Sequence, residues 1–262
     1  MTATYDNLLI ERDGAVAIVT FNRPAVLNAI NAPTLDALRR AVLDLQRDDI
    51  VRVVILSGAG EKAFVAGADI NELAVQTPTG GRELALAGQH VFDLIENLGK
   101  PVIAAINGYA LGGGCELAMA CTLRLAADTA KIGLPEITLG ILPGYAGTQR
   151  MARLVGKGRA MELILTGTPI PAEEAVRIGL INRMVPAANL MTEARALAAQ
   201  LSKNAPMAMR YILSAINEGL EMPFAEACVY EATLFGLVAS TDDMREGTRA
   251  FLEKRKANFK GR

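Results

Sequence analysis

Two glycine-rich stretches stand beside apolar runs that are typical of strands. The first is AGAD at residues 66–69, and the second, residues 107–120, contains the triplet GGG at 112–114. Glycines between a strand and a helix open the backbone to close approach and expose unpaired N–H groups at the helix N-terminus. Two such N–H groups converging on one oxygen atom would form an oxyanion hole. A turn that only lets a helix pack tightly on a sheet needs the same glycines, so the pattern alone leaves both interpretations open.

Two glutamates lie close to these glycines in the sequence. Glu116 falls in the first turn of the helix expected after the triplet, where an acid also stabilises the positive helix end by about 0.3–1 kcal/mol. Glu136 follows a proline among apolar residues. A carboxyl group in so apolar a setting must be paired or partly protonated, which is how general acids are tuned. Each glutamate alone has a structural explanation, but together with the glycines they suggest acid–base chemistry that needs no imidazole.

The residue counts exclude several other kinds of chemistry. The 262 residues include 27 basic and 28 acidic side chains, one histidine and three cysteines. The cysteines lack the C-x-x-C spacing of zinc sites, so no metal centre is expected. None of the four serines stands in a G-x-S-x-G elbow, and neither a P-loop nor a G-x-G-x-x-G after a strand occurs. The nearly neutral net charge gives no reason to expect nucleic acid.

Strand and helix signals alternate through the first half of the chain. Apolar, β-rich runs that predict strands occupy residues 14–21, 51–57 and 101–107. Amphipathic helices are expected to begin at Pro33 and to cover residues 84–98, the latter after a loop at 77–81. Strands separated by helices of this length favour an α/β fold in which parallel strands are joined by crossover helices.

The β signals stop at about residue 190. Four helices are expected beyond it, separated by proline and glycine, at residues 190–203, 206–219, 223–238 and 242–254. The sequence therefore predicts an α/β core over residues 1–190 and a helical region over 191–262. The last twelve residues carry five basic side chains and one acidic side chain, a local charge of +4. A solvated, dipole-matched helix end explains this charge as well as a binding role does.

Length and patterning also indicate the setting of the protein. A chain of this size buries roughly 70–75% of its unfolded surface, so it needs no disulfide or metal to fold. No apolar run approaches about 18 residues, and residues 1–6 lack the pattern of a signal peptide. These observations predict a cytoplasmic protein without membrane spans.

The order of these motifs resembles the enoyl-CoA hydratase/isomerase (crotonase) superfamily, and most of all the enoyl-CoA hydratases of fatty-acid β-oxidation. The resemblance begins at NRP (22–24) and LNA (27–29), and it is densest from KPVIAAING (100–108) to PG (143–144) and GTQR (147–150). It ends at the terminal EKRKANF. No single motif is specific, whereas their combination in this order is.

The resemblance implies a role for each of the candidate residues. The backbone N–H groups of Ala68 and Gly113 would form the oxyanion hole for a thioester carbonyl. Glu116 and Glu136 would be the two catalytic glutamates of a hydratase that adds water to a trans-2-enoyl-CoA and gives a 3-hydroxyacyl-CoA. Gly144 would help to position the water. Relatives that isomerise, decarboxylate or dehalogenate typically change one or both acids, so the pair favours hydration.

The resemblance also implies further contacts and an assembly. Three more residues of the first glycine-rich loop would bind substrate: Ala66, Asp69 and Ile70. Four residues would contact coenzyme A: Arg23, Lys62 and, from a neighbouring subunit, Phe251 and Lys254. The implied fold is a crotonase-type spiral of β-β-α turns with a C-terminal helical region that drives trimerisation. The protein would form a homotrimer or a dimer of trimers. No cofactor is expected, because coenzyme A is part of the acyl-CoA substrate.

Two positions depart from the family pattern. Ala25 replaces a lysine that often follows NRP and reaches a CoA phosphate, so phosphate contacts must come from elsewhere. Tyr145 stands where a small residue is common, and its phenol either narrows the acyl region or turns away from it. The alternatives are an isomerase, a hydratase of a branched or aromatic acyl-CoA, and a non-catalytic CoA- or RNA-binding member of the fold. A serine protease of a related spiral fold is excluded, because no serine and histidine stand in suitable positions of the sequence.

Overall fold

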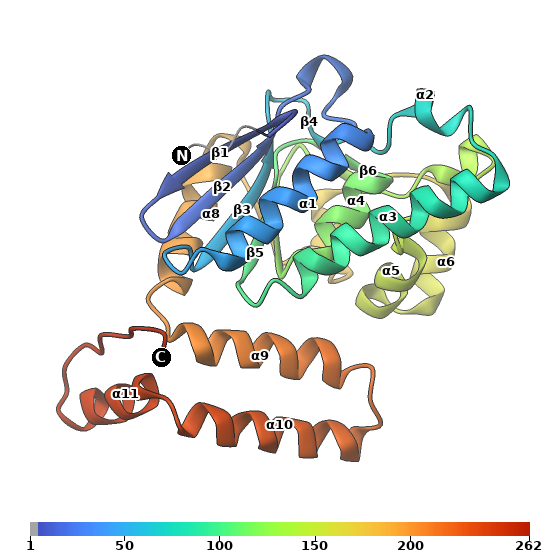
Figure 1. The fold of residues 1–262 in the computed structure, drawn as a ribbon. Helices are drawn as coiled ribbons and strands as arrows, with labels where there is room; N and C mark the ends of the chain where they lie inside the picture. The colour runs from blue at the N-terminus through green and yellow to red at the C-terminus, as the bar shows by residue number, and fades with distance from the viewer. Residues whose placement is uncertain (1–4) are drawn as a thin grey trace.

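A six-stranded sheet forms the centre of the molecule in the computed structural model, which describes residues 5–262 (Figure 1). The strand order is β1-β2-β3-β5-β7-β10, with β1 antiparallel to β2 and all other neighbours parallel. Every residue of β3 and of β5 is buried, as continuous apolar runs in a covered parallel sheet should be. The strands are β1 (Leu8–Asp13), β2 (Val16–Phe21), β3 (Val53–Gly58), β5 (Val102–Ile106), β7 (Leu123–Ala127) and β10 (Arg183–Val185).

A second, smaller sheet has the order β4-β6-β8-β9. Its strands are two or three residues long: β4 (Ala63–Val65), β6 (Tyr109–Leu111), β8 (Lys131–Gly133) and β9 (Ile170–Pro171). The chain visits the sheets alternately, because β3, β5 and β7 are neighbours in the large sheet while β4, β6 and β8 are neighbours in the small one. Helices α2 and α3 follow the pair β3 and β4, and helix α4 follows the pair β5 and β6. This arrangement is the predicted spiral of β-β-α turns.

The helices of the core cover the two sheets. Helix α8 packs on β2, β3, β5 and β7, whereas α1 packs against α3, and α4 lies between α3 and α5. Asn31 begins α1 by accepting a hydrogen bond from the N–H of Thr34 at 3.1 Å. The helices are α1 (Ala32–Arg47), α2 (Ile70–Leu73), α3 (Pro78–Glu96), α4 (Gly113–Ala120), α5 (Gly147–Val155), α6 (Lys157–Thr166), α7 (Ala172–Arg177) and α8 (Leu190–Leu201). The described residues also form three 3₁₀ turns: η1 (Pro24–Val26), η2 (Glu136–Leu139) and η3 (Ala187–Asn189).

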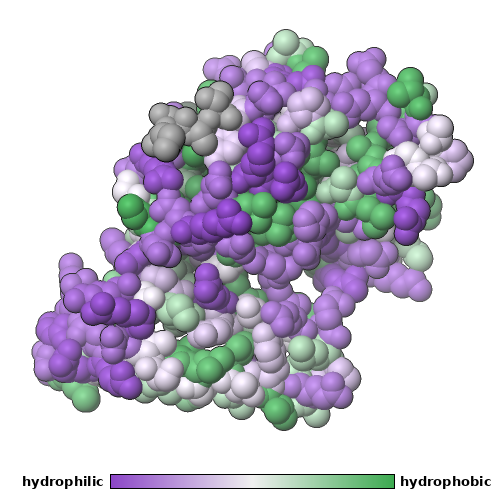
Figure 2. Space-filling model, viewed as in Figure 1, coloured by the Kyte–Doolittle hydropathy of each residue, from purple (hydrophilic) through white to green (hydrophobic). Residues whose placement is uncertain are grey.

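The last three helices form a separate layer below the core (Figure 1). Helices α9 (Pro206–Gly219) and α10 (Phe224–Ala239) pack side by side as a hairpin, and α11 (Asp242–Leu252) follows. Apolar side chains are exposed on this layer, among them Leu220, Phe224 and Phe235, and green patches mark part of it in Figure 2. The division of the chain at residues 190 and 191 stays a prediction.

The sequence predicted the long elements well and the short ones poorly. The expected loop at 77–81 is wrong, because Thr77 caps α3 at Gly80 N–H and Pro78 opens the helix. Strand β1 was not expected, since most of its residues are exposed or half-buried. Within residues 5–262, no helix is both long and apolar enough to cross a membrane.

Candidate active site

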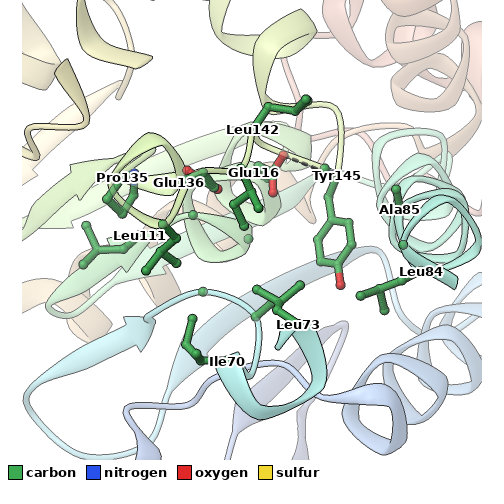
Figure 3. A pocket seen from close by; sticks show the side chains of 18 of the residues that line it. Ile70, Leu73, Leu84, Ala85, Leu111, Glu116, Pro135, Glu136, Leu142 and Tyr145 are labelled. Atoms are coloured by element: carbon green, nitrogen blue, oxygen red, sulfur yellow. Dashed lines mark hydrogen bonds between the residues drawn. The ribbon is translucent and has the colours of Figure 1, made fainter. Parts of the chain in front are cut away.

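A cavity of about 720 Å³ lies between α2, α3 and the loops that follow the strands of the small sheet. Both glycine-rich stretches and both glutamates line it (Figure 3). Its remaining walls are mostly apolar, with leucine side chains from α2, α3, β6 and the loop before Pro143. Residues from positions 66 to 145 thus meet in one space, as the sequence analysis expected of its candidates.

The residues predicted to form the oxyanion hole lie side by side. A Cβ atom added at Gly113 would be 3.6 Å from the backbone nitrogen of Ala68. Neither the N–H of Ala68 nor that of Gly113 donates a hydrogen bond to any group among residues 5–262. Gly112, which precedes α4, has φ +50° and ψ −124°, a conformation that residues with a side chain rarely adopt. This turn leaves the first N–H groups of α4 available to a ligand oxygen.

The loop that carries Ala68 is fixed on both sides. Gly67 C=O accepts a hydrogen bond from Ile30 N–H at 2.9 Å, and Asp69 N–H donates to Ile30 C=O at 2.8 Å. Arg23 adds a second fastening, with Nη2 3.2 Å from Asp69 Oδ2 and Nη1 2.6 Å from the carbonyl oxygen of Ala29. Because these contacts bracket Ala68, they hold its N–H in one place.

Glu116 is anchored to the loop between η2 and α5. Its Oε1 accepts hydrogen bonds from the N–H groups of Tyr145 at 2.8 Å and Gly147 at 2.7 Å. A Cβ atom at Gly147 would lie 2.7 Å from this oxygen, so the close approach requires glycine. No group among residues 5–262 donates a hydrogen bond to Oε2. One carboxylate oxygen therefore fixes the side chain, and the other is free to act.

The environment of Glu116 suits proton transfer near neutral pH. The side chain is only 2% exposed, and this burial, with the charge of Glu136, raises its pKa to about 7. The hydrogen bonds from Gly147 and Tyr145 and the charge of Arg150 act in the opposite direction, since they favour the carboxylate. A general base is most effective when its pKa lies close to the working pH.

Glu136 lies at the start of η2, facing the same cavity (Figure 3). Burial raises the pKa of this carboxyl group. Its Oε2 is buried and has no hydrogen-bond partner among residues 5–262. A buried oxygen without a partner is unfavourable unless it binds a ligand, a water or a proton. Glu136 is therefore a second group that can hold or release a proton in the cavity.

Two residues outside the cavity support the loop that holds Glu116. Arg150 binds Glu96 through Nε at 3.0 Å and Nη2 at 2.6 Å, and its Nη1 donates to the carbonyl oxygen of Tyr145 at 3.1 Å. Gln89 donates to the carbonyl oxygen of Gly144 at 2.9 Å. In the sequence, Arg150 stands out only as part of the GTQR motif, and Gln89 carries no signal. Because both side chains reach this loop through its backbone carbonyls, only the folded chain reveals these roles.

Three of the four other predicted water- or substrate-binding residues lie at the cavity. Ala66, Ile70 and Gly144 line the cavity, whereas Asp69 points away from it toward Arg23 and Asn71.

None of the four residues expected to contact coenzyme A lines the cavity. The Arg23 guanidinium is held by Asp69 and Ala29, and Lys62 is exposed at the start of β4. Phe251 is exposed in the last turn of α11, and Lys254 is exposed just after this helix. Among residues 5–262, no three histidine, cysteine, aspartate or glutamate side chains gather as a metal site requires.

Known proteins are similar to this chain in both sequence and fold. The family model described as enoyl-CoA hydratase/isomerase matches residues 11–262. The short-chain-enoyl-CoA hydratase of Clostridium acetobutylicum is 47% identical over 98% of this chain and 99% of that protein. The crotonyl-CoA hydratase of Syntrophomonas wolfei is 47% identical over 97% and 98%. An enoyl-CoA hydratase structure from Bacillus anthracis superposes with a TM-score of 0.95 at 40% identity, covering 98% of this chain and all of that one.

Proposed function

The chain belongs to the enoyl-CoA hydratase/isomerase family, and from this premise we propose that it is an enoyl-CoA hydratase. It adds water reversibly across the 2,3 double bond of a trans-2-enoyl-CoA and gives a 3-hydroxyacyl-CoA, as in fatty-acid β-oxidation. Two of its relatives carry the names short-chain-enoyl-CoA hydratase and crotonyl-CoA hydratase.

The first step of the proposed mechanism is polarisation of the thioester. Its carbonyl oxygen accepts hydrogen bonds from the N–H groups of Ala68 and Gly113, both of which lack a partner among residues 5–262. Negative charge grows on this oxygen as water attacks Cβ, so the two fixed donors bind the transition state more strongly than the substrate. Each such donor contributes about 10²–10³ to the rate.

The second step is the transfer of two protons. Oε2 of Glu116 accepts a proton from the water as its oxygen forms a bond to Cβ. Glu136, whose pKa is raised by burial, gives the second proton to Cα as the double bond is lost. Gly144, on the cavity wall between the glutamates and α3, assists in placing the water. The two carboxyl groups then exchange protons with solvent and return to their initial states.

One observation carries the proposal of hydration over isomerisation. Two carboxyl groups face a single cavity, beside two N–H groups that have no partner among residues 5–262. Glu116 is anchored by two backbone donors, and the buried Oε2 of Glu136 has no partner among the same residues. Addition of water needs one group that takes a proton and another that gives one. A 3-enoyl isomerase needs only one group to carry a proton between two carbons.

The assembly forms part of the proposal. The exposed apolar residues of the helical layer favour a subunit interface, because patches of this kind are seldom left in water. A homotrimer or a dimer of trimers would cover them and bring Phe251 and Lys254 of one subunit toward coenzyme A of another. Lys62 of the same subunit, free of side-chain partners among residues 5–262, would meet its phosphates. No cofactor is needed, and we propose a cytoplasmic location, in keeping with the three free cysteines.

A spectrophotometric assay tests the proposed function. The conjugated enoyl thioester absorbs in the ultraviolet, and hydration removes this absorbance. Crotonyl-CoA should lose it in the presence of the protein, and mass spectrometry should show a product heavier by one water. A double bond that moves without a gain of water would assign an isomerase instead. Binding without any change in the thioester would assign a non-catalytic CoA-binding protein.

A further inference from the structure

The phenol ring of Tyr145 forms one wall of the cavity (Figure 3). Only 6% of the residue is exposed, so the ring closes the cavity at this side. It meets Phe92 edge to face, with 5.3 Å between the ring centroids and an interplanar angle of 82°. Its backbone is held as well, since the N–H binds Glu116 and the carbonyl oxygen binds Arg150. Tyr145 is therefore a fixed wall and not a mobile side chain.

Gly88 provides the space in which this ring lies. It occupies the interior of α3, where glycine is unfavourable relative to alanine. A Cβ atom at this position would lie 2.1 Å from Cδ1, 2.3 Å from Cε1 and 2.6 Å from Cγ of Tyr145. Contacts this short are impossible, so any larger residue would force the ring away from α3. Glycine at position 88 is therefore explained by packing, because it leaves room for the ring of Tyr145.

The ring lies beside the predicted oxyanion hole. A Cβ atom added at Gly113 would lie 3.4 Å from ring atoms Cδ2 and Cε2, so the ring reaches the predicted oxyanion hole. The hydroxyl end points toward Leu73 and Leu84 (Figure 3). Coenzyme A is too large for the cavity and must leave through its open side. The acyl chain beyond Cβ therefore runs toward the closed side, where it meets Tyr145.

We infer that Tyr145 is a specificity-determining residue that limits this enzyme to short 2-enoyl thioesters. The inference rests on the proposed function, because it assigns the acyl chain to this cavity. Longer chains lose the burial of their terminal methylene groups or must bend out through the opening. Each methylene group that stays in water forfeits about fourfold in kcat/KM.

The test compares kcat/KM for crotonyl-CoA and trans-2-decenoyl-CoA in the wild type, Tyr145→Ala and Tyr145→Phe. Tyr145→Ala should raise the ratio of decenoyl to crotonyl activity at least tenfold. Tyr145→Phe, which keeps the ring, should retain the wild-type ratio. Tyr145→Val provides an intermediate cavity if the alanine variant does not fold. An unchanged ratio in a folded alanine or valine variant would overturn the inference. A wild type that hydrates neither thioester would instead overturn the proposed function.

A double-mutant cycle tests the role of Gly88 independently. Gly88→Ala alone should lower kcat/KM for crotonyl-CoA at least tenfold, because the displaced ring enters the cavity. In the Tyr145→Ala background the same substitution meets no ring and should change kcat/KM less than twofold. Strong non-additivity of this kind is the mark of residues in direct contact. Equal effects in both backgrounds would show that the glycine does not act through Tyr145 and would refute the fixed wall.

Discussion

Replacement of Glu116 by glutamine is expected to abolish hydration and yet to stabilise the fold at alkaline pH. The amide of Gln keeps Oε1 as an acceptor for the N–H groups of Tyr145 and Gly147, so the loop loses no hydrogen bond. It cannot accept a proton from water. General-base catalysis contributes about 10²–10⁴ in rate, and kcat should fall by that factor.

The size of the stabilisation follows from the pKa of Glu116. Burial and the charge of Glu136 raise this pKa to about 7, against an ordinary value of 4.5. The folded protein then binds the proton more tightly than the unfolded chain, so stability falls as the pH rises from 4.5 through 7. Ionisation of Glu116 costs the fold on the order of 3 kcal/mol above pH 8, but only about 1 kcal/mol at pH 5. Glutamine removes this cost because it carries no charge.

Urea unfolding at pH 5 and pH 8.5 measures the effect. Glu116→Gln should be more stable than the wild type by about 3 kcal/mol at pH 8.5 and by about 1 kcal/mol at pH 5. Glu173→Gln, at an exposed position of α7, controls for the loss of an acid and should show no such pH-dependent gain. A gain of equal size at both pH values, or a loss at pH 8.5, would refute the argument that burial of the Glu116 charge strains the fold.

Three further substitutions test the surroundings of Glu116 and Ala68. Glu136→Gln removes a neighbouring negative charge and should lower the pKa of Glu116, which moves the acidic limb of the kcat/KM profile to lower pH; a move to higher pH would contradict this coupling. Arg150→Met should move the same limb to higher pH and lower kcat about tenfold, whereas Arg153→Met on the exposed side of α5 should do neither. Arg23→Met frees Asp69 and should lower kcat about ten- to a hundredfold with little change in unfolding temperature; an unchanged kcat would show that the loop of Ala68 needs no such support.

The sequence predicted the parts of the fold whose signal is long. Strands such as β3 and β5 are continuous apolar runs, and a proline marks the N-terminal end of both α9 and α10. The limits of these elements can therefore be predicted from the sequence. The small sheet was out of reach, because strands of two or three residues show no periodicity. Residues 77–81 were misassigned since two glycines outweighed the cap at Thr77 and the proline that follows it.

The candidate site divides in the same way. Glu116 and Glu136 could be singled out because an acid in apolar surroundings is unusual in any sequence, and the structure brings both to one cavity. The contacts of Arg23 could not be foreseen, since Asp69, its partner, lies far along the chain. Gly88 carried no signal at all, as its purpose is a contact with a ring 57 positions away. Such partners are set by tertiary packing.

The central claim is that two carboxyl groups and two backbone N–H groups hydrate an enoyl thioester in this cavity. The most direct test measures the initial rate of crotonyl-CoA hydration for the wild type, Glu116→Gln and Glu136→Gln at one pH and at saturating substrate. We expect an active wild type and a loss of at least about a hundredfold in each variant, with folding confirmed by circular dichroism. Hydration near the wild-type rate in either folded variant would contradict it.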